Sequence, residues 1–288
     1  MALGLRFRAP WVLDVRDLWP EAAVVLGELR GARAIRAAER LESFLYRSAG
    51  AIVTVTEPFR EQIAAQVPGA RIEVIPNGTT RIWLEAGEAP ADREAAGMPA
   101  DRFVWMYAGN FGIAQGLETA VRAAALLGDE FRLVLLGDGP EREQLTRLAA
   151  EAAPGQVELW TPLQPQDAAV RMRAADALLV SLAPQPELAK FLPSKLFDCA
   201  ALARPLIVAA RGEAPRVAEA AGVALVVEPG DAEALAAAVR RLRDEPELAT
   251  RLAAAGPALG SEYLRERQVE RMESVLAEVA ATGRQRRG

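Results

Sequence analysis

Short apolar segments alternate with longer amphipathic segments through most of the chain. Apolar segments of the kind that form buried parallel strands occur at 103–108, 131–136, 157–160, 177–181, 206–209 and 224–227. Between them, apolar residues recur at helical spacing at 116–127, 141–152, 165–174 and 215–220, and a further helix opens after Pro193. This strict alternation predicts a parallel sheet with right-handed crossovers, that is, a doubly wound α/β domain.

The first part of the chain repeats the pattern on a smaller scale. Predicted strands at 11–16, 51–56 and 71–75 enclose predicted helices at 31–48 and from about residue 58. Residues 85–100 are rich in Gly, Pro, Ala and charged residues and show no period, which indicates an interdomain linker. We therefore expect a first domain at 1–84 and a second domain at 101–260.

The end of the chain is expected to be helical. Asp231 is placed to cap a helix that runs to about residue 243, and a second helix opens at 244–247. A long last helix is predicted at 261–280, followed by a basic tail at 281–288.

The helix after Pro193 carries the strongest candidate chemistry. Ser194 is a favourable N-cap, and Lys195 and Asp198 share one helical face. The N–H groups at a helix start and the Lys195 ammonium suit a phosphate, and Asp198 is placed to accept hydrogen bonds from ribose hydroxyls. An ordinary capped helix with a surface Lys/Asp pair is the alternative interpretation.

Two glycine-containing turns follow predicted strands at the same edge of the sheet. The first is Tyr107-Ala-Gly109-Asn110-Phe-Gly112, and the second is Leu136-Gly137-Asp138-Gly139. Glycines there let the backbone approach a phosphate, which makes candidate phosphate-binding residues of Gly109, Asn110, Gly112, Gly137, Asp138 and Gly139. The spacing is not that of the dinucleotide fingerprint, so two routine βα turns remain the alternative.

Composition narrows the chemistry. The net charge of −5 and the lack of a basic, aromatic-interleaved run argue against a nucleic-acid partner. The chain has no histidine, which excludes Ser/His triads and imidazole zinc sites. A single cysteine, Cys199, precludes an internal disulfide and fits a reducing compartment, so a cytoplasmic location is expected. No apolar run approaches the ~20 residues of a membrane span. The first ten residues lack a secretory signal.

The predicted helix at 31–48 carries four arginines mostly off its apolar face: Arg33, Arg36, Arg40 and Arg47. A solvated charged face is the commoner reason for such a pattern. The other interpretation is a surface for an anionic membrane, which would place the protein at the inner face of the membrane, or for a diphosphate-bearing acceptor.

Six sequence blocks, in order, resemble those of a known family. They are Arg16-Asp-Leu-Trp-Pro-Glu21, Val74-Ile-Pro-Asn-Gly78, Tyr107-Ala-Gly-Asn-Phe-Gly112, Leu136-Gly-Asp-Gly139, Pro193-Ser-Lys-Leu-Phe-Asp198 and Val227-Glu-Pro-Gly-Asp231. Over nearly its whole length the chain resembles a family-4 glycosyltransferase of the GT-B fold, from the bacterial branch that makes capsule, O-antigen and related polysaccharides.

The resemblance implies two Rossmann-like domains. The C-terminal domain would hold the sugar nucleotide and the N-terminal domain the acceptor, with the last helix, 261–280, packing back on the first domain. The N-terminal domain is expected to be incomplete, because the glycine-rich strand and βα units that precede the Arg16 block in the family are not in this sequence.

The resemblance also assigns roles, with departures. Arg16 and Asp17 stand where the family often has a His-Asp pair, and Lys190 stands where it has the first of two glutamates, so these three are the candidate catalytic residues. Asp198 keeps the second carboxylate. Asn110 and Gln115 replace a family Arg and Lys on the diphosphate. The charge would therefore be offset by Ser194, Lys195 and nearby N–H groups.

The resemblance implies a retaining glycosyltransferase that uses no metal or cofactor. Its donor would be a nucleotide-diphosphate sugar, most simply a UDP-sugar, and its acceptor a lipid-linked or saccharide molecule. A truncated, non-catalytic nucleotide-binding or partner protein is the main alternative. A UDP-sugar 2-epimerase of the same fold is a third, against which the lack of histidine counts.

Overall fold

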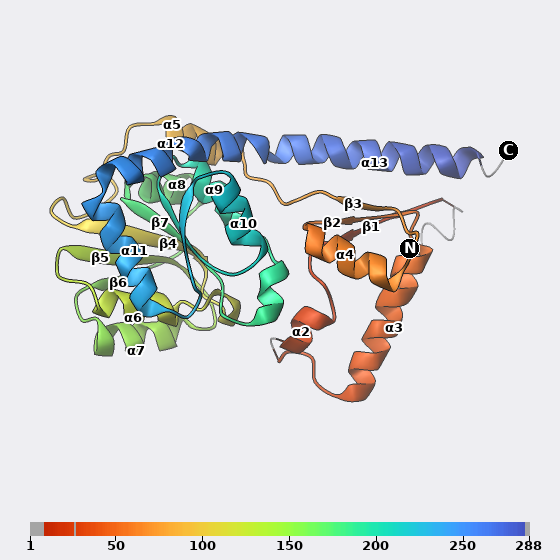
Figure 1. The fold of residues 1–288 in the computed structure, drawn as a ribbon, viewed down its shortest axis with the longest axis horizontal. Helices are drawn as coiled ribbons and strands as arrows, with labels where there is room; N and C mark the ends of the chain where they lie inside the picture. Colours follow the sequence, from red (N-terminus) through yellow and green to blue (C-terminus); the bar gives the residue numbers. More distant parts are fainter. Residues whose placement is uncertain (1–8, 26, 286–288) are drawn as a thin grey trace. The chain divides into compact units, whose positions relative to one another are not determined.

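The computed structural model describes residues 9–25 and 27–285, which form two compact units. Unit 1 comprises the chain up to Asn77 together with the segment from Arg265 onward, and unit 2 comprises Gly78–Leu264. The chain therefore passes between the units twice, at 77/78 and at 264/265. Both units have a parallel sheet with helices, as predicted (Figure 1).

Unit 2 is built on a six-stranded parallel sheet in the order β6-β5-β4-β7-β8-β9. Its strands are β4 Phe103–Asn110, β5 Phe131–Asp138, β6 Val157–Trp160, β7 Ala177–Ser181, β8 Leu206–Ala209 and β9 Ala224–Val227. This is the strand order of a doubly wound Rossmann fold, in which the direction of winding reverses between the two central strands, here β4 and β7. The predicted fold of this domain is confirmed.

Helices cover both faces of this sheet. They are α5 Arg81–Glu88, α6 Glu118–Ala125, α7 Arg142–Ala152, α8 Pro165–Ala174, α9 Lys195–Ala201, α10 Glu213–Ala220, α11 Ala232–Asp244 and α12 Pro246–Glu262, with short 3-10 turns η1 Ile113–Gln115 and η2 Pro186–Lys190. The expected cap of α11 is confirmed, since the Asp231 carboxylate accepts from Ala234 N at 2.8 Å. The helix predicted from residue 116 begins at Glu118, because Gly116 is left-handed.

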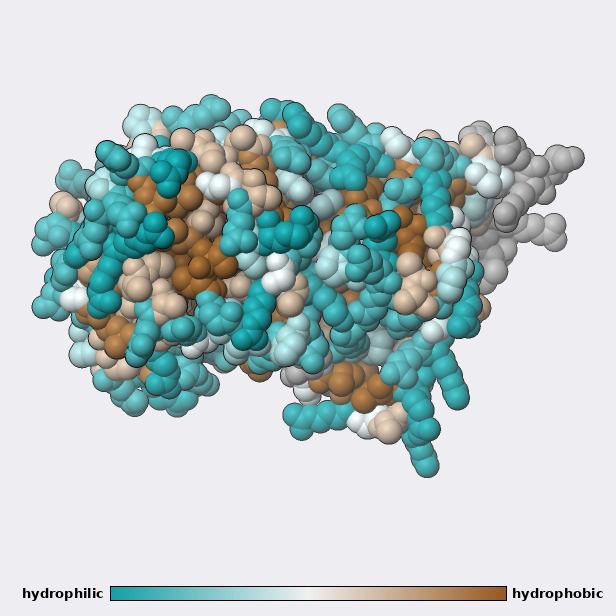
Figure 2. All heavy atoms as spheres, viewed as in Figure 1, coloured by the Kyte–Doolittle hydropathy of each residue, from teal (hydrophilic) through white to brown (hydrophobic). Residues whose placement is uncertain are grey.

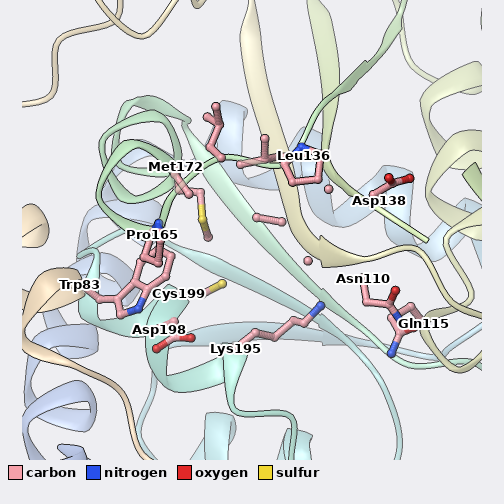
Figure 3. A pocket seen from close by; sticks show the side chains of 16 residues that line it. Trp83, Asn110, Gln115, Leu136, Asp138, Pro165, Met172, Lys195, Asp198 and Cys199 are labelled. Atoms are coloured by element: carbon pink, nitrogen blue, oxygen red, sulfur yellow. The ribbon is translucent and has the colours of Figure 1, made fainter.

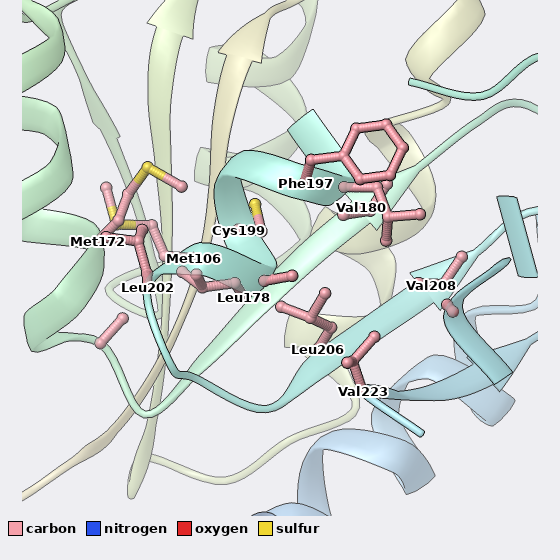
Figure 4. Packing of buried hydrophobic residues seen from close by; sticks show 14 of the residues in the cluster. Met106, Met172, Leu178, Val180, Phe197, Cys199, Leu202, Leu206, Val208 and Val223 are labelled. Carbon is pink, nitrogen blue, oxygen red and sulfur yellow. The ribbon is translucent and has the colours of Figure 1, made fainter. Parts of the chain in front are cut away.

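Two hydrophobic cores lie on the two faces of the sheet. One joins the strands to α8, α9 and α10 and includes Met106, Met172 and Phe197 (Figure 4). The other joins them to α6, α7, α11 and the first turns of α12. The central strands β4, β5, β7 and β8 are largely buried between these two cores, which explains their near-continuous apolar sequences.

Unit 1 has a three-stranded parallel sheet, β1-β2-β3, and four helices among the described residues. The elements are β1 Val12–Val15, α2 Glu21–Val25, α3 Ala32–Ser48, β2 Ala51–Thr54, α4 Glu57–Gln66, β3 Ile72–Val74 and α13 Arg265–Gln285. Val275 and Val279 of α13 are buried against Ala51, Val53 and Ile75. The last helix therefore packs on the strands of the first part of the chain.

The structure differs from the predicted domain boundaries in three places. Residues 81–88 form α5 and belong to unit 2, whereas we expected the first domain to extend to residue 84. The helix expected at 261–280 runs instead from Arg265 to Gln285, after α12 ends at Glu262. The predicted basic tail is therefore helical as far as residue 285, and its remainder lies outside the described residues.

The segment predicted as a linker, 85–100, is fixed to unit 2. Arg93 donates to both carboxylate oxygens of Asp176 at 2.8 Å and to the carbonyls of Pro99 and Arg102. Asp176 also accepts from Val104 N at 2.7 Å. One ion pair thus ties the segment to the start of β4, an interaction that its composition does not reveal.

We expect Arg93→Ala to lower the free energy of unfolding by about 2 to 3 kcal/mol, because it removes charge-assisted bonds and leaves Asp176 without this partner. Urea unfolding followed by circular dichroism measures the change. The control is Arg122→Ala, which breaks an exposed helical pair with Glu118 and should cost about 0.5 kcal/mol or less. Equal losses in the two variants would contradict a special role for Arg93.

Candidate functional site

A cavity of about 550 Å³ lies at the carboxyl ends of β4 and β5 in unit 2. β4 pairs with β7 only at Trp105 and Met106, so the two strands separate toward their carboxyl ends. A cavity at this reversal point is where open α/β sheets bind ligands. Its lining residues are Trp83, Ala108, Gly109, Asn110, Gln115, Leu136, Gly137, Asp138, Pro162, Leu163, Pro165, Ala168, Met172, Lys195, Asp198 and Cys199.

The cavity has an apolar end and a polar end (Figure 3). Trp83, Pro165 and Met172 gather at one end, beside Asp198. The amides of Asn110 and Gln115 lie at the other. Lys195 extends from α9 toward the polar end. This arrangement suits an elongated ligand with a flat apolar group at one end and an anionic group at the other.

Lys195 is held by the end of β4. Its ammonium donates to the hydroxyl of Tyr107 and lies 3.9 Å from the centre of the Tyr107 ring. The Tyr107 hydroxyl in turn donates to the carbonyl of Asn110 at 2.8 Å. A Cβ on Gly109 would lie 2.6 Å from the Lys195 nitrogen, so the ammonium occupies the space that this glycine leaves open.

Burial controls the protonation of these groups. Desolvation lowers the pKa of Lys195 to about 8, although the charges of Cys199 and Asp198 act in the opposite direction. Burial also raises the pKa of the Cys199 thiol to about 12, so the thiol is neutral at physiological pH. Lys195 therefore remains mainly charged at neutral pH and loses its proton at moderately alkaline pH.

Asp198 lies one turn further along α9. Its Oδ1 accepts from the Thr79 hydroxyl at 2.6 Å, and Thr79 itself is fully buried. A carboxylate has capacity for further hydrogen bonds on its two oxygens. Asp198 can thus accept from ligand hydroxyls while Thr79 holds its orientation.

The predicted helix cap at Ser194 is wrong. Ser194 already has helical backbone angles and its side chain makes no capping bond, because an N-cap must be extended to reach the first turn. The N–H groups of Leu196, Phe197 and Asp198 are bonded to the carbonyls of Pro193 and Ser194. They are therefore not free for a phosphate, and Ser194 does not line the cavity.

Only part of the predicted glycine set lines the cavity. β4 and β5 run two residues further than predicted, so Gly109 and Gly137 face each other as paired strand residues. With Asn110 and Asp138, these two line the cavity. Gly112 and Gly139 do not. A Cβ on Gly139 would lie 2.5 Å from the Phe111 carbonyl, so its role is close backbone packing.

The three predicted catalytic residues are not among the lining residues. Lys190 ends η2 in unit 2 and is partly buried. Arg16 and Asp17 belong to unit 1, whereas all the lining residues belong to unit 2. Arg16 pairs with Asp14 at 2.7 Å and donates to Asn77 Oδ1.

Sequence reasoning missed the apolar end of the cavity. Trp83 falls within the predicted first domain, 1–84. The packing of its helix, α5, against α8 and α9 depends on contacts between residues far apart in the sequence, which a local pattern does not reveal. Ala168 and Met172, four residues apart, were recognised only as part of a helix. A usable signal is the position of α8, which follows the carboxyl end of β6 after the short connection 161–164.

Comparisons with known families match both parts of the chain. The model described as "Glycosyl transferases group 1" matches residues 88–258, and the model described as "Glycosyl transferase 4-like domain" matches residues 1–78. The chain belongs to the group 1 glycosyl transferases. The predicted family is thereby confirmed at this level.

Two curated relatives come from Rhizobium meliloti (strain 1021). The lipopolysaccharide core biosynthesis glycosyltransferase LpsD is 37% identical over 69% of this chain and 54% of its own length. The corresponding glycosyltransferase LpsE is 30% identical over 84% of this chain and 69% of its own length. The chain thus spans about half the length of LpsD and about two thirds of that of LpsE.

Solved structures share the fold. Sucrose-phosphate synthase from Thermosynechococcus elongatus has a TM-score of 0.79 at 24% identity, and covers 98% of this chain and 71% of its own. Anabaena Alr3699/HepE in complex with UDP has a TM-score of 0.77 at 18% identity, over 96% of this chain and 74% of its own. These neighbours confirm the predicted GT-B fold class.

Two features are absent from the described residues. None of their helices is long and apolar enough to cross a membrane. They also hold no group of three or more His, Cys, Asp or Glu arranged to bind a metal ion.

We expect Lys195 to titrate with a pKa of about 8, well below that of an ordinary lysine, because burial disfavours its charged form. The sequence has only two lysines, so ¹³C-lysine NMR across pH 6 to 11 should give two signals, and Lys190→Arg assigns the one from Lys195. A midpoint above pH 10 would contradict the buried position of its ammonium.

Proposed function

We propose that unit 2 is the donor-binding part of a glycosyltransferase that transfers a sugar from a nucleotide-diphosphate sugar. The observation that carries the proposal is the placement of Lys195 and Asp198 on one turn of α9, beside a cavity at the reversal point of a doubly wound sheet. Family membership supports the class of reaction.

Each part of such a donor matches one part of the cavity. The apolar end formed by Trp83, Pro165 and Met172 suits the base, and Asp198 suits the ribose hydroxyls. Lys195 suits the diphosphate, because it is the one cationic side chain among the lining residues, which all lie in the described part of the chain. Asn110 and Gln115 add neutral amide donors at the same end.

These residues can assist departure of the nucleotide diphosphate. As the bond between sugar and diphosphate breaks, negative charge grows on the leaving oxygen, and a fixed ammonium in a partly buried site stabilises that charge. The proposal needs no cofactor or metal for this step. It includes retention of configuration, which rests on the resemblance alone.

We propose UDP as the nucleotide and a saccharide or lipid-linked acceptor in cell-surface polysaccharide synthesis. The structure of HepE in complex with UDP supports the first point. The lipopolysaccharide core relatives LpsD and LpsE support the second. We place this reaction in the cytoplasm.

Asp198→Asn should weaken UDP binding at least about tenfold, because charge-assisted hydrogen bonds to ribose hydroxyls contribute about 1.5 to 3 kcal/mol each. Calorimetric titration with UDP measures this. Asp231→Asn is the matched control: it makes the same chemical change at the cap of α11, where Asn also caps well, and should leave affinity unchanged. Equal UDP affinities of the Asp198→Asn and Asp231→Asn variants would show that Asp198 does not contact the nucleotide. A wild-type chain that binds no UDP would refute the proposal.

We also propose that α3 of unit 1 contacts an anionic membrane, where a lipid-linked acceptor would lie. Arg33, Arg36, Arg40 and Arg47 are exposed on this helix, and Leu41 and Phe44 beside them are about half exposed. Figure 2 shows hydrophilic side chains projecting from this side of unit 1, with apolar side chains among them. Exposed arginines with large apolar side chains are the composition of a helix that lies in a membrane interface.

Charge reversal on α3 tests the membrane contact. Arg36→Glu with Arg40→Glu should weaken binding to phosphatidylglycerol-containing vesicles at least about tenfold, since each basic residue near an anionic surface contributes about 1 kcal/mol. Arg147→Glu with Arg251→Glu, both exposed in unit 2, changes the net charge equally and should have little effect. Vesicle sedimentation decides, and equal losses in both pairs would contradict a specific α3 surface.

A further inference from the structure

We propose that Tyr107 is a positioning residue for Lys195, and that Tyr107, Gly109 and Asn110 form an ammonium seat that directs Lys195 to the anionic end of the donor. The inference rests on the proposed function. It assigns a task to a tyrosine that does not line the cavity and that is not among the candidate site residues predicted from the sequence.

Tyr107 is a rigid support. Its side chain is fully buried in the core that β4 forms with the helices α6, α7 and α11. The centre of its ring lies 6.3 Å from the centre of the Phe111 ring. Its hydroxyl hydrogen is directed to the Asn110 carbonyl at 2.8 Å, which leaves the oxygen lone pairs to accept from the Lys195 ammonium. Burial raises the pKa of Tyr107, so it remains a neutral acceptor.

The seat also uses the face of the aromatic ring. The Lys195 nitrogen lies 3.9 Å from the ring centre, within the range of a cation–π interaction. An ammonium has three N–H donors, and the bond to Tyr107 uses one. Two donors remain for a ligand.

Gly109 provides the space for the ammonium. A Cβ there would lie 2.6 Å from the Lys195 nitrogen and 3.3 Å from the Tyr107 hydroxyl, and the residue has a φ of 144°. Any side chain at position 109 would therefore displace the ammonium from Tyr107.

Without the seat, Lys195 has a competing partner. Asp198 lies three residues along the same helix and is also in the cavity, so a mobile Lys195 could pair with it at helical spacing. Thr79 holds Asp198 at one oxygen and Tyr107 holds Lys195 at the end of β4. The two hydrogen bonds keep the cation and the carboxylate available for different parts of one ligand.

Lysine NMR of two variants tests the geometry without a ligand. The groups that face the ammonium are Tyr107 and Gly109 from β4, and Asp198 and Cys199 from α9. Tyr107→Phe keeps the ring that holds the ammonium in place but removes the hydrogen-bond acceptor. The charged form of Lys195 therefore loses a partner without reaching Asp198, and the Lys195 midpoint should fall by about one pH unit. Gly109→Ala should push the ammonium toward water, and the midpoint should rise.

Gly155→Ala is the control for backbone strain. Gly155 has a φ of 76°, and no neighbouring atom lies within 4 Å of the position that a Cβ would take, so alanine there carries strain without displacing a neighbour. It should leave the Lys195 midpoint unchanged. Unchanged midpoints in both Tyr107→Phe and Gly109→Ala would overturn the ammonium seat.

Ligand binding supplies the second readout. Since UDP should bind the charged form of Lys195, Tyr107→Phe should weaken UDP binding about eightfold at pH 8.5 and less than about twofold at pH 6.5, with uridine binding unchanged. The same loss for UDP and uridine at both pH values would show a merely structural role and overturn the proposal. A wild-type chain that binds no UDP would refute the proposed function, whereas the NMR titrations would still decide the position of Lys195.

Discussion

The tight packing of α9 is the constraint on which the candidate site depends. Five of its seven residues are buried, and α5 and α12 both pack against it. A Cβ at Gly87 of α5 would lie 2.1 Å from the Ala201 carbonyl, and one at Gly256 of α12 would lie 2.2 Å from the Ala200 carbonyl. At these two glycines the backbones of α5 and α12 lie directly against the backbone of α9, which leaves α9 little freedom to shift. This fixes the origins of Lys195 and Asp198 relative to the strand ends.

The site concentrates positive charge on one atom. In the family that the sequence resembles, an Arg and a Lys take the positions of Asn110 and Gln115, whose amides are neutral here. Lys195 carries a full charge on α9 instead. Burial makes that charge less favourable, which is why the pKa of Lys195 is lowered. The bond to Tyr107 and the ring beneath it offset part of this effect of burial. A single ammonium with two remaining donors can still bind an anionic group strongly, because the fixed direction of its hydrogen bonds and the low local dielectric strengthen each bond.

The sequence was sufficient for the fold and for one side of the site. Strand–helix alternation and the i, i+3 pair of Lys195 and Asp198 are local patterns, and they predicted the sheet and the helix that positions both residues. The failures depend on contacts between residues far apart. Composition made the segment 85–100 look like a linker, because only the folded chain brings Arg93 to Asp176.

The missed site residues follow the same rule. Tyr107 belongs to a predicted strand, and Trp83 lies in no predicted element, just before the expected linker. The first acquires its role from a lysine 88 positions away, and the second from the packing of α5 on α8 and α9. Ser194 shows the converse error. Its residue type favours a cap, but its backbone is already helical in the turn that starts at Pro193.

The carboxylate of the candidate site is attached to the segment where the chain passes between units. Thr79, two residues after the 77/78 boundary, donates its hydroxyl to Asp198 and its N–H to the Tyr263 carbonyl, just before the 264/265 boundary. Thr79 also forms an isolated parallel bridge with Leu264. The two chain passages are thus bonded to each other and to Asp198 through one buried residue. A ligand that donated hydrogen bonds to Asp198 would act on that same hydrogen-bonded group. The candidate site and both connecting segments therefore share one local network.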